Sequence, residues 1–212
     1  MLLALMLAAA LTGSHPAGTP PDPLAAAIEQ YQTVKSYRVT IRSLHDDSKE
    51  HIRYYYRKPG FVRMEFIRPH AGAVLVYNPS TQRVRLWPFG AGRFPELNLS
   101  PGNLLIRSSR GQHVDRSDVG ALFENVRTLQ QGGNTEVSGE EHMDGRMVVH
   151  LVVTGTGSAA VAGVHSYELW LDTATRFPAR VISRDQQDAI IETVMMEGLE
   201  INVALPDALF NP

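Results

Sequence analysis

The sequence predicts a mainly β protein: one curled antiparallel sheet with an apolar concave face, and two or three helices, of which two are amphipathic and can cover that face. Three observations lead to this prediction. Apolar and polar residues alternate with a period of two along most of the chain, as in half-buried strands. The alternating runs follow one another through short turns, which antiparallel strands allow and parallel strands do not. Two other runs have the 3.6-residue period of an amphipathic helix.

The first helical run opens after Pro23, and its apolar residues recur at spacings of three and four. They are Leu24, Ala27, Ile28, Tyr31 and Val34. The period then changes to two in the runs 37–42, 52–57, 62–67, 73–77 and 83–87. Pro59-Gly60 and Asn78-Pro79-Ser80 are turn signals between these runs. This first half of the chain therefore predicts a meander with one apolar face and one face rich in Arg.

The pattern breaks between Pro88 and Gln112, in a segment rich in Gly and Pro that also contains the apolar run Leu104-Leu105-Ile106. Long connections of this kind are usually lids or binding loops. A second helix follows, for which Ser117 is the predicted N-cap and Asp118 a favourable first-turn residue. Its apolar stripe is Val119, Leu122, Phe123, Val126 and Leu129, and Gln131-Gly132-Gly133 ends it.

Strands resume after the second helix, in the runs 135–139, 147–154, 166–172, 179–183 and 190–197. Asp144-Gly145 is a hairpin turn signal between two of them, and the tail 204–212 contains too much proline for a strand. The total is about ten strands, and a twisted sheet of that size curls. Its concave face is a core if side chains fill it and a cavity for an apolar ligand if they only line it.

The N-terminal segment is predicted to be a signal peptide, residues 1–17, followed by a stiff leader, residues 18–23, and a single domain, residues 24–212. Met1 to Leu11 is an unbroken run of Met, Leu and Ala, and a bilayer-spanning helix needs about 20 residues. No Lys or Arg precedes the run, and a buried N-terminal helix is the alternative interpretation. We expect export and a soluble mature protein.

Composition excludes several classes of function. The 212 residues contain no Cys, which excludes disulfide scaffolds, thiolate metal sites and cysteine nucleophiles. A net charge of −2 argues against a non-specific nucleic-acid binder. Of the 20 basic residues only three are Lys, which indicates either carboxylate and phosphate recognition by Arg or a residue-usage bias of the source organism.

No motif of established chemistry is present in the sequence. His45-Asp46-Asp47 and Glu140-Glu141-His142 are interpreted as solvated turns, because neighbouring strand residues point to opposite faces and do not converge on one ion. Gly155-Thr156-Gly157-Ser158 lacks the Lys of a phosphate loop and is predicted to be a turn. We predict no catalytic residues, no metal and no cofactor.

Candidate ligand-binding residues come from the period of two, which places alternate residues on one face. They are Val39, Ile41, Tyr54, Tyr56, Val62, Met64, Phe66 and Leu86. Tyr54 and Tyr56 are either ordinary strand packing or a hydrophobic wall with hydroxyls at its rim. Arg57 and Lys58 are either the solvated end of a hairpin or cations at the edge of that wall.

Several motifs, taken in order, are similar to those of a known family. They are Val34-Lys35-Ser36-Tyr37, Arg57-Lys58-Pro59, Gly60-Phe61-Val62-Arg63-Met64-Glu65, Val74-Leu75-Val76-Tyr77-Asn78-Pro79, Val84-Arg85-Leu86-Trp87, Tyr167-Glu168-Leu169-Trp170-Leu171-Asp172-Thr173, Phe177-Pro178-Ala179-Arg180-Val181 and Leu209-Phe210-Asn211-Pro212. Their order and spacing resemble those of the LolA-like periplasmic lipoprotein carriers and the related outer-membrane lipoprotein-sorting proteins, over residues 24–212.

The resemblance implies an unclosed β-barrel with a helical lid over an apolar cavity that carries acyl chains across the periplasm. The lid residues expected here are Leu104, Leu105, Leu122 and Phe123. In such carriers an Arg of the basic-basic-Pro segment holds the lid. The matching residues are Arg57 and Lys58, of which Lys58 lacks the fork of Arg.

The sequence thus leads to the hypothesis of a non-enzymatic periplasmic carrier. Its partners would be lipoprotein acyl chains or another lipid, and a transfer partner in the inner or outer membrane. Two alternatives stay open at this point. One is an envelope sensor or adaptor of the same fold that binds lipidated ligands and a membrane partner, and the other is an exported hydrolase.

Overall fold

The computed structural model describes residues 22–45, 48–107 and 111–212. The predicted signal peptide, residues 1–17, and residues 18–21 of the leader lie outside them. The elements follow one another in the order α1 (Pro23–Thr33), β1 (Ser36–His45), β2 (Ser48–Arg57), β3 (Phe61–Arg68), β4 (Val74–Asn78), β5 (Arg83–Trp87), β6 (Leu97–Leu99), η1 (Leu104–Ile106), η2 (Val114–Arg116), α2 (Val119–Gly132), β7 (Asn134–Met143), β8 (Arg146–Thr154), β9 (Ser166–Asp172), β10 (Pro178–Arg184), β11 (Ile190–Ile201) and η3 (Asp207–Leu209).

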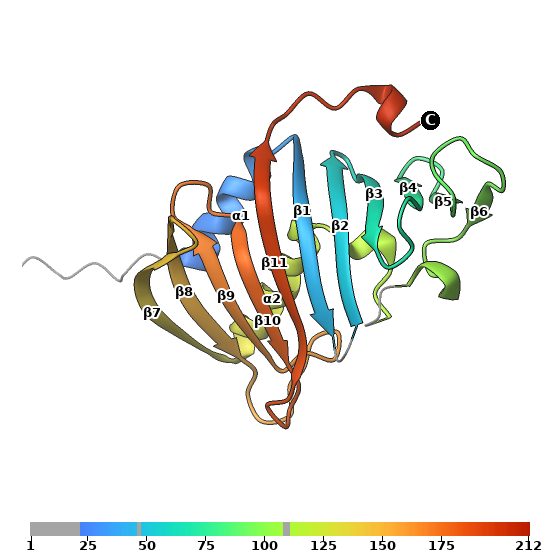
Figure 1. The fold of residues 1–212 in the computed structure, drawn as a ribbon. Helices are drawn as coiled ribbons and strands as arrows, with labels where there is room; N and C mark the ends of the chain where they lie inside the picture. The colour runs from blue at the N-terminus through green and yellow to red at the C-terminus, as the bar shows by residue number, and fades with distance from the viewer. Residues whose placement is uncertain (1–21, 46–47, 108–110) are drawn as a thin grey trace, which may run out of the picture.

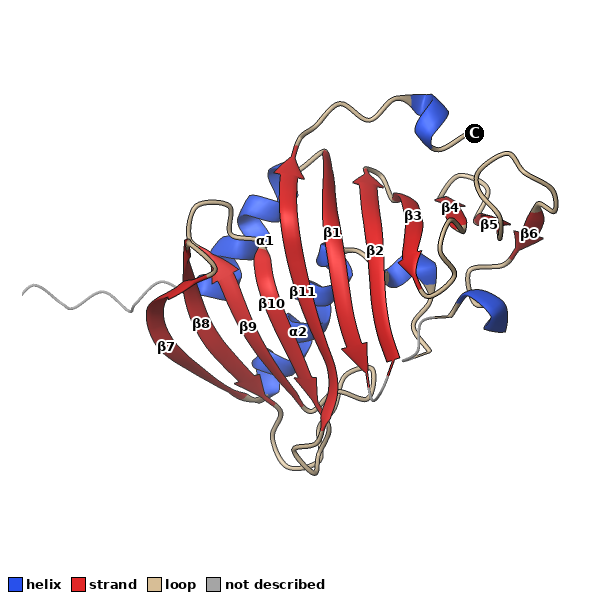
Figure 2. Cartoon of the chain, in the orientation of Figure 1, coloured by secondary structure: helices blue, strands red, loops and turns tan. Residues whose placement is uncertain are grey.

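One antiparallel sheet contains all eleven strands of the described residues, in the order β6-β5-β4-β3-β2-β1-β11-β10-β9-β8-β7. The first and last strands of the chain pair with each other at the middle of the sheet, and β6 and β7 are its two edges. The sheet curves without closing, and both α-helices lie on the same face of it (Figures 1 and 2). The predicted mainly β fold with a curled, unclosed antiparallel sheet is confirmed.

The alternation of side chains along the strands builds the main core on the concave face. Tyr54 of β2 lies between Val39 of β1 and Met64 of β3, so equivalent apolar positions on neighbouring strands form rows across the sheet. The same row continues through Leu75 and Leu86. The helices add Leu24, Ala27, Phe123, Val126 and Leu129 to this core.

The C-terminal tail packs on the opposite, convex face. Phe210 is buried there against Val74, Val76 and Trp87 of β4 and β5. Two Arg side chains on that face donate hydrogen bonds to carbonyl oxygens of the tail: Arg63 Nη1 lies 2.7 Å from the oxygen of Leu209, and Arg85 Nη2 lies 3.2 Å from that of Phe210. The Arg-rich face therefore holds part of the protein's own chain.

Asp118, not the predicted Ser117, is the N-cap of α2. Its Oδ1 accepts hydrogen bonds from the N–H groups of Gly120 and Ala121, at 2.7 and 3.3 Å. Ser117 instead ends the short helix η2 and donates to the carbonyl oxygen of Val114. Both residues are good caps, and the η2 turn immediately before α2 moves the start of α2 one residue along the chain.

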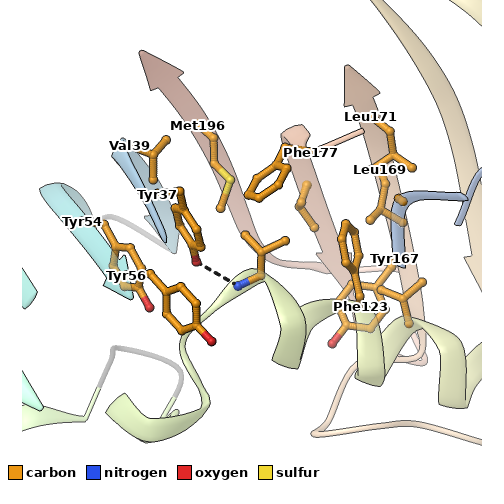
Figure 3. Close-up of a cluster of buried hydrophobic side chains, with 14 of the residues drawn as sticks. Tyr37, Val39, Tyr54, Tyr56, Phe123, Tyr167, Leu169, Leu171, Phe177 and Met196 are labelled. Atoms are coloured by element: carbon orange, nitrogen blue, oxygen red, sulfur yellow. Dashed lines mark hydrogen bonds between the residues drawn. The ribbon is translucent and has the colours of Figure 1, made fainter. Parts of the chain in front are cut away.

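Three tyrosines join the start of α2 to the sheet and to α1. The Tyr31 hydroxyl of α1 donates to Asp118 Oδ1 at 2.7 Å, and the Val119 N–H donates to the Tyr37 hydroxyl of β1 at 3.2 Å (Figure 3). Tyr37 stacks on Tyr56 with ring centroids 5.1 Å apart. Burial and the neighbouring carboxylate of Asp118 raise the pKa of Tyr31 far above its ordinary value, so its hydroxyl stays a donor.

Replacing Asp118 tests this junction. In Asp118→Ala, α2 loses its cap and the buried Tyr31 hydroxyl loses its acceptor, so the free energy of unfolding should fall by about 2–3 kcal/mol. Urea denaturation measures the change. Glu124→Ala is the control on the same helix, because Glu124 pairs with Arg116 in an exposed position, and it should change stability by less than about 0.5 kcal/mol. Equal stabilities for the two variants would contradict the role of Asp118.

Candidate binding cavity

The two α-helices cover only part of the concave face. They lie over the part of the sheet formed by β7 to β11 and β1 (Figure 1). Over β2 to β6, residues 104–107 and 111–117, which include the short helices η1 and η2, form a covering segment.

A cavity of about 630 Å³ lies between that segment and the sheet. This volume falls within the range of about 300–1,000 Å³ that is usual for small-molecule sites. Its walls are largely aliphatic and aromatic. The apolar lining includes Ile52, Met64, Phe66, Leu75, Leu86 and Leu97 from the strands and Leu105, Ile106 and Val114 from the covering segment.

The lining of the cavity also includes the polar side chains of Glu50, His70, Arg107 and His113. Burial raises the pKa of Glu50, the nearby carboxylate of Glu192 raises it further, and His45 and His70 oppose the shift. The Glu50 carboxyl therefore binds a proton more readily than an exposed one does.

Hydrogen bonding fixes the covering segment where it meets α2. The hydroxyls of Tyr54 and Ser117 lie 3.1 Å apart, and Ser117 Oγ donates to the Val114 oxygen at 2.6 Å. Farther out, Arg107 Nε donates to the Gly102 oxygen at 2.9 Å. The covering segment is thus tied to β2 at the α2 end, while Leu104 and Leu105 at its other end are exposed.

Comparison with known proteins gives a fold but no close relative. No family model matches the chain, and no curated protein matches it. Among solved structures, an uncharacterised conserved protein from Thermus thermophilus is 14% identical, with 89% of this chain and 91% of that chain covered and a TM-score of 0.55. The complex of Pseudomonas aeruginosa MucA and MucB contains a chain that is 18% identical, with 88% and 59% covered and a TM-score of 0.57. The Mycobacterium tuberculosis lipoprotein LppX is 12% identical, with 88% and 99% covered and a TM-score of 0.50.

The chain shares its fold with these three proteins. At these identities the matches describe how the chain folds and nothing more specific. The chain spans only 59% of the chain it matches in the MucA/MucB complex. Among the described residues, no helix is long and apolar enough to cross a membrane, and no three His, Cys, Asp or Glu side chains are placed to hold a metal ion.

The fold brings the eight candidate ligand-binding residues into one cluster on the concave face. Met64, Phe66 and Leu86 line the cavity of about 630 Å³. Ile41 and Tyr54 line a smaller cavity of about 150 Å³ beside α2, which Met64 also borders. The others, Val39, Tyr56 and Val62, are buried in the packed part of the core and line neither cavity.

The four expected lid residues have different surroundings. Phe123 is fully buried in the core, with its ring centroid 6.0 Å from that of Tyr31, and Leu122 lines the smaller cavity. Helix α2 therefore packs on the sheet as part of the core. Leu105 lines the larger cavity, and Leu104 beside it is exposed.

Arg57, one of the two residues expected at the latch or rim, contacts the C-terminal tail. Along β2, Arg57 points to the opposite face from Tyr54 and Tyr56, as the period of two requires. Its Nη1 donates to the Leu205 oxygen at 3.0 Å and lies 2.7 Å from Asp207 Oδ1, so Arg57 holds the C-terminal tail. Lys58 does reach a helix: its Nζ donates to the carbonyl oxygen of Gln32 in α1 at 2.7 Å.

Sequence reasoning did not single out several residues that line the cavity. Ile52 and Leu75 follow the same alternation as the candidates, so the period of two could have identified them. Leu97 belongs to β6, which falls in the segment where the alternation breaks. Glu50 carried no signal, because nothing in the sequence shows that it lies near Glu192.

Substitution of Arg57 distinguishes the two roles. Arg57→Ala should loosen the tail by about 1–2 kcal/mol, because a charged hydrogen bond to Leu205 and an ion pair with Asp207 are lost together. Hydrogen exchange of residues 205–210 should speed up while that of α1 stays the same. Lys58→Ala is the matched control and should affect the end of α1 instead. Faster exchange in α1 or α2 of Arg57→Ala, with the tail unchanged, would restore the lid interpretation.

Proposed function

We propose that this chain is a non-enzymatic periplasmic carrier that binds the acyl chains of lipoproteins or of other lipids and moves them toward the outer membrane. The observation that supports this proposal is the apolar cavity of about 630 Å³ over β2 to β6. A folded core of this size normally fills such a space with its own side chains. An apolar ligand is the occupant that such walls favour.

The free energy of binding comes from removing the acyl chain from water. Each buried methylene contributes about 0.8 kcal/mol, so a single long chain binds without a polar contact to its head group. The polar lining residues Glu50, His70 and Arg107 provide hydrogen-bonding groups for a head group. Release then requires an acceptor that offers an equally apolar environment.

Native mass spectrometry of the protein purified from its own source tests the proposal directly. A carrier with an apolar cavity should retain lipid, and the bound mass identifies its class. The complementary measurement is the binding of a fluorescent long-chain fatty acid to the delipidated protein. Absence of both a bound lipid and fatty-acid binding would refute the carrier function.

Met64→Glu is the substitution that separates a cavity from a solid core. Met64 is half-buried and lines both cavities. A carboxylate there can stay hydrated while the cavity is empty, so the fold should lose less than about 1.5 kcal/mol, whereas a charge in a solid core costs several kcal/mol. An acyl chain would have to dehydrate the carboxylate, and the fatty-acid affinity should fall at least about tenfold.

Met195→Glu provides the matched control. Met195 has the same residue type and the same half-buried state, but it lies opposite Arg42 and Arg180 on the convex side of β11. This variant should bind the fatty acid as the wild type does. If Met64→Glu unfolds while Met195→Glu stays folded, the space around Met64 is a solid core and not a cavity.

An envelope adaptor of the same fold is the second candidate, and the similarity to the MucA/MucB complex favours it. An adaptor needs a protein partner in addition to a lipid. The tagged full chain, isolated from its source after mild crosslinking, should then carry one membrane protein in a fixed ratio. A carrier should instead yield lipid without a stoichiometric protein.

A further inference from the structure

Large apolar side chains gather on the surface at one end of the molecule. Among the described residues, seven large hydrophobic side chains are exposed, and four of them fall within the segment 88–107. They are Phe89 (66% exposed), Phe94 (93%), Leu104 (79%) and Leu105 (73%). A single exposed apolar residue is ordinary, whereas a group of this kind usually marks an interaction site.

The group lies beside the mouth of the large cavity. Segment 88–107 forms the end of the molecule beyond β5, on the opposite side from β7 (Figure 1). Phe89 and Leu105 belong both to this exposed group and to the lining of the cavity. The apolar surface is therefore continuous from the outside of the molecule to the cavity walls.

The charge of the same segment is positive. It contains Arg93 and Arg107, and its one acidic residue is Glu96. The Glu96 carboxylate lies 3.9 Å from the guanidinium of Arg85, which balances its charge. Aromatic and aliphatic side chains combined with Arg are typical of surfaces that bind the interface of anionic membranes.

We propose that this end of the protein docks on the surface of an anionic lipid bilayer. Phe94 and Leu104 enter the head-group region, Arg93 and Arg107 bind lipid phosphates, and the cavity mouth faces the acyl chains. A lipid then passes between bilayer and cavity along Phe89 and Leu105 without crossing water. This inference rests on the proposed carrier function and adds the place of exchange and the chemistry of the surface recognised.

The choice of a bilayer over a protein partner follows from the shape and chemistry of the group. Phe94 is almost completely exposed, so its ring projects from the surface. Insertion into a fluid apolar layer buries a projecting ring without any complementary pocket. Arg93 and Arg107 of the same segment carry guanidinium groups, which match the phosphates that cover such a layer.

The test compares two double variants of the full chain. Phe94→Ser with Leu104→Ser removes the two exposed residues that do not line the cavity. Val137→Ser with Ile190→Ser is the control, because these residues are 50% and 51% exposed and belong to other strands, β7 and β11. Binding to vesicles is measured by flotation, and fatty-acid binding is measured in the absence of vesicles.

The wild type and the control should float with phosphatidylglycerol vesicles, and more weakly with phosphatidylcholine vesicles or at high salt. The Phe94/Leu104 variant should lose at least tenfold in vesicle affinity, keep its fatty-acid affinity within twofold, and transfer the fatty acid to vesicles more slowly. Undiminished vesicle binding by this variant would overturn the docking proposal. The docking proposal would also be overturned if the wild type bound fatty acid but no vesicles. The same holds if the Phe94/Leu104 variant lost only a crosslinked protein partner and kept its vesicle binding. Vesicle binding without fatty-acid binding would instead refute the carrier function.

Discussion

The carboxylate of Asp118 fixes the position of the helices on the sheet. It accepts two backbone N–H groups of α2 and the hydroxyl of Tyr31 in α1, and the next residue, Val119, donates to Tyr37 of β1. Helix α2 therefore begins above the middle of the sheet and extends toward β8, against which it packs. Both helices are held on that side. Helix α1 still contacts β2 through Tyr31 and Tyr56, but no residue of α1 or α2 is in the described lining of the larger cavity.

The fold consequently divides its concave face between stability and binding. On the helix side, Phe123, Val126 and Leu129 are buried in one core cluster with side chains of β8 and β9. On the other side, Met64 and Leu86 face a cavity. The packed core and the larger cavity therefore occupy different parts of the same face of the sheet.

The period of two predicted the strands and the shared face of Val62, Met64 and Phe66, because each strand is buried on one side only. The same period places the Arg57 side chain on the opposite face of β2 from Tyr56. The resemblance to carriers with an Arg latch had instead suggested that Arg57 contacts a lid on the concave face. The start of α2 was missed by one residue because Ser117 and Asp118 are equally good caps and only the preceding η2 turn decides between them. Strand β6 was not predicted, because its residues fall in the segment where the alternation breaks. A cavity was implied by the resemblance, but the period of two alone could not decide between a lined cavity and a filled core.

Packing on the convex face stabilises strands β3 to β5, which have no α-helix on their concave face. The C-terminal tail packs on the convex face of these strands. Phe210 is buried against them, and Arg63 and Arg85 donate hydrogen bonds to backbone oxygens of the tail. Arg57 adds an ion pair with Asp207. The tail follows β11, the central partner of β1, so it links the middle of the sheet to its outer strands across the convex surface. Packing of the tail on the convex face therefore stabilises β3 to β5. These strands can then keep an apolar cavity on their concave face, where no α-helix packs on them.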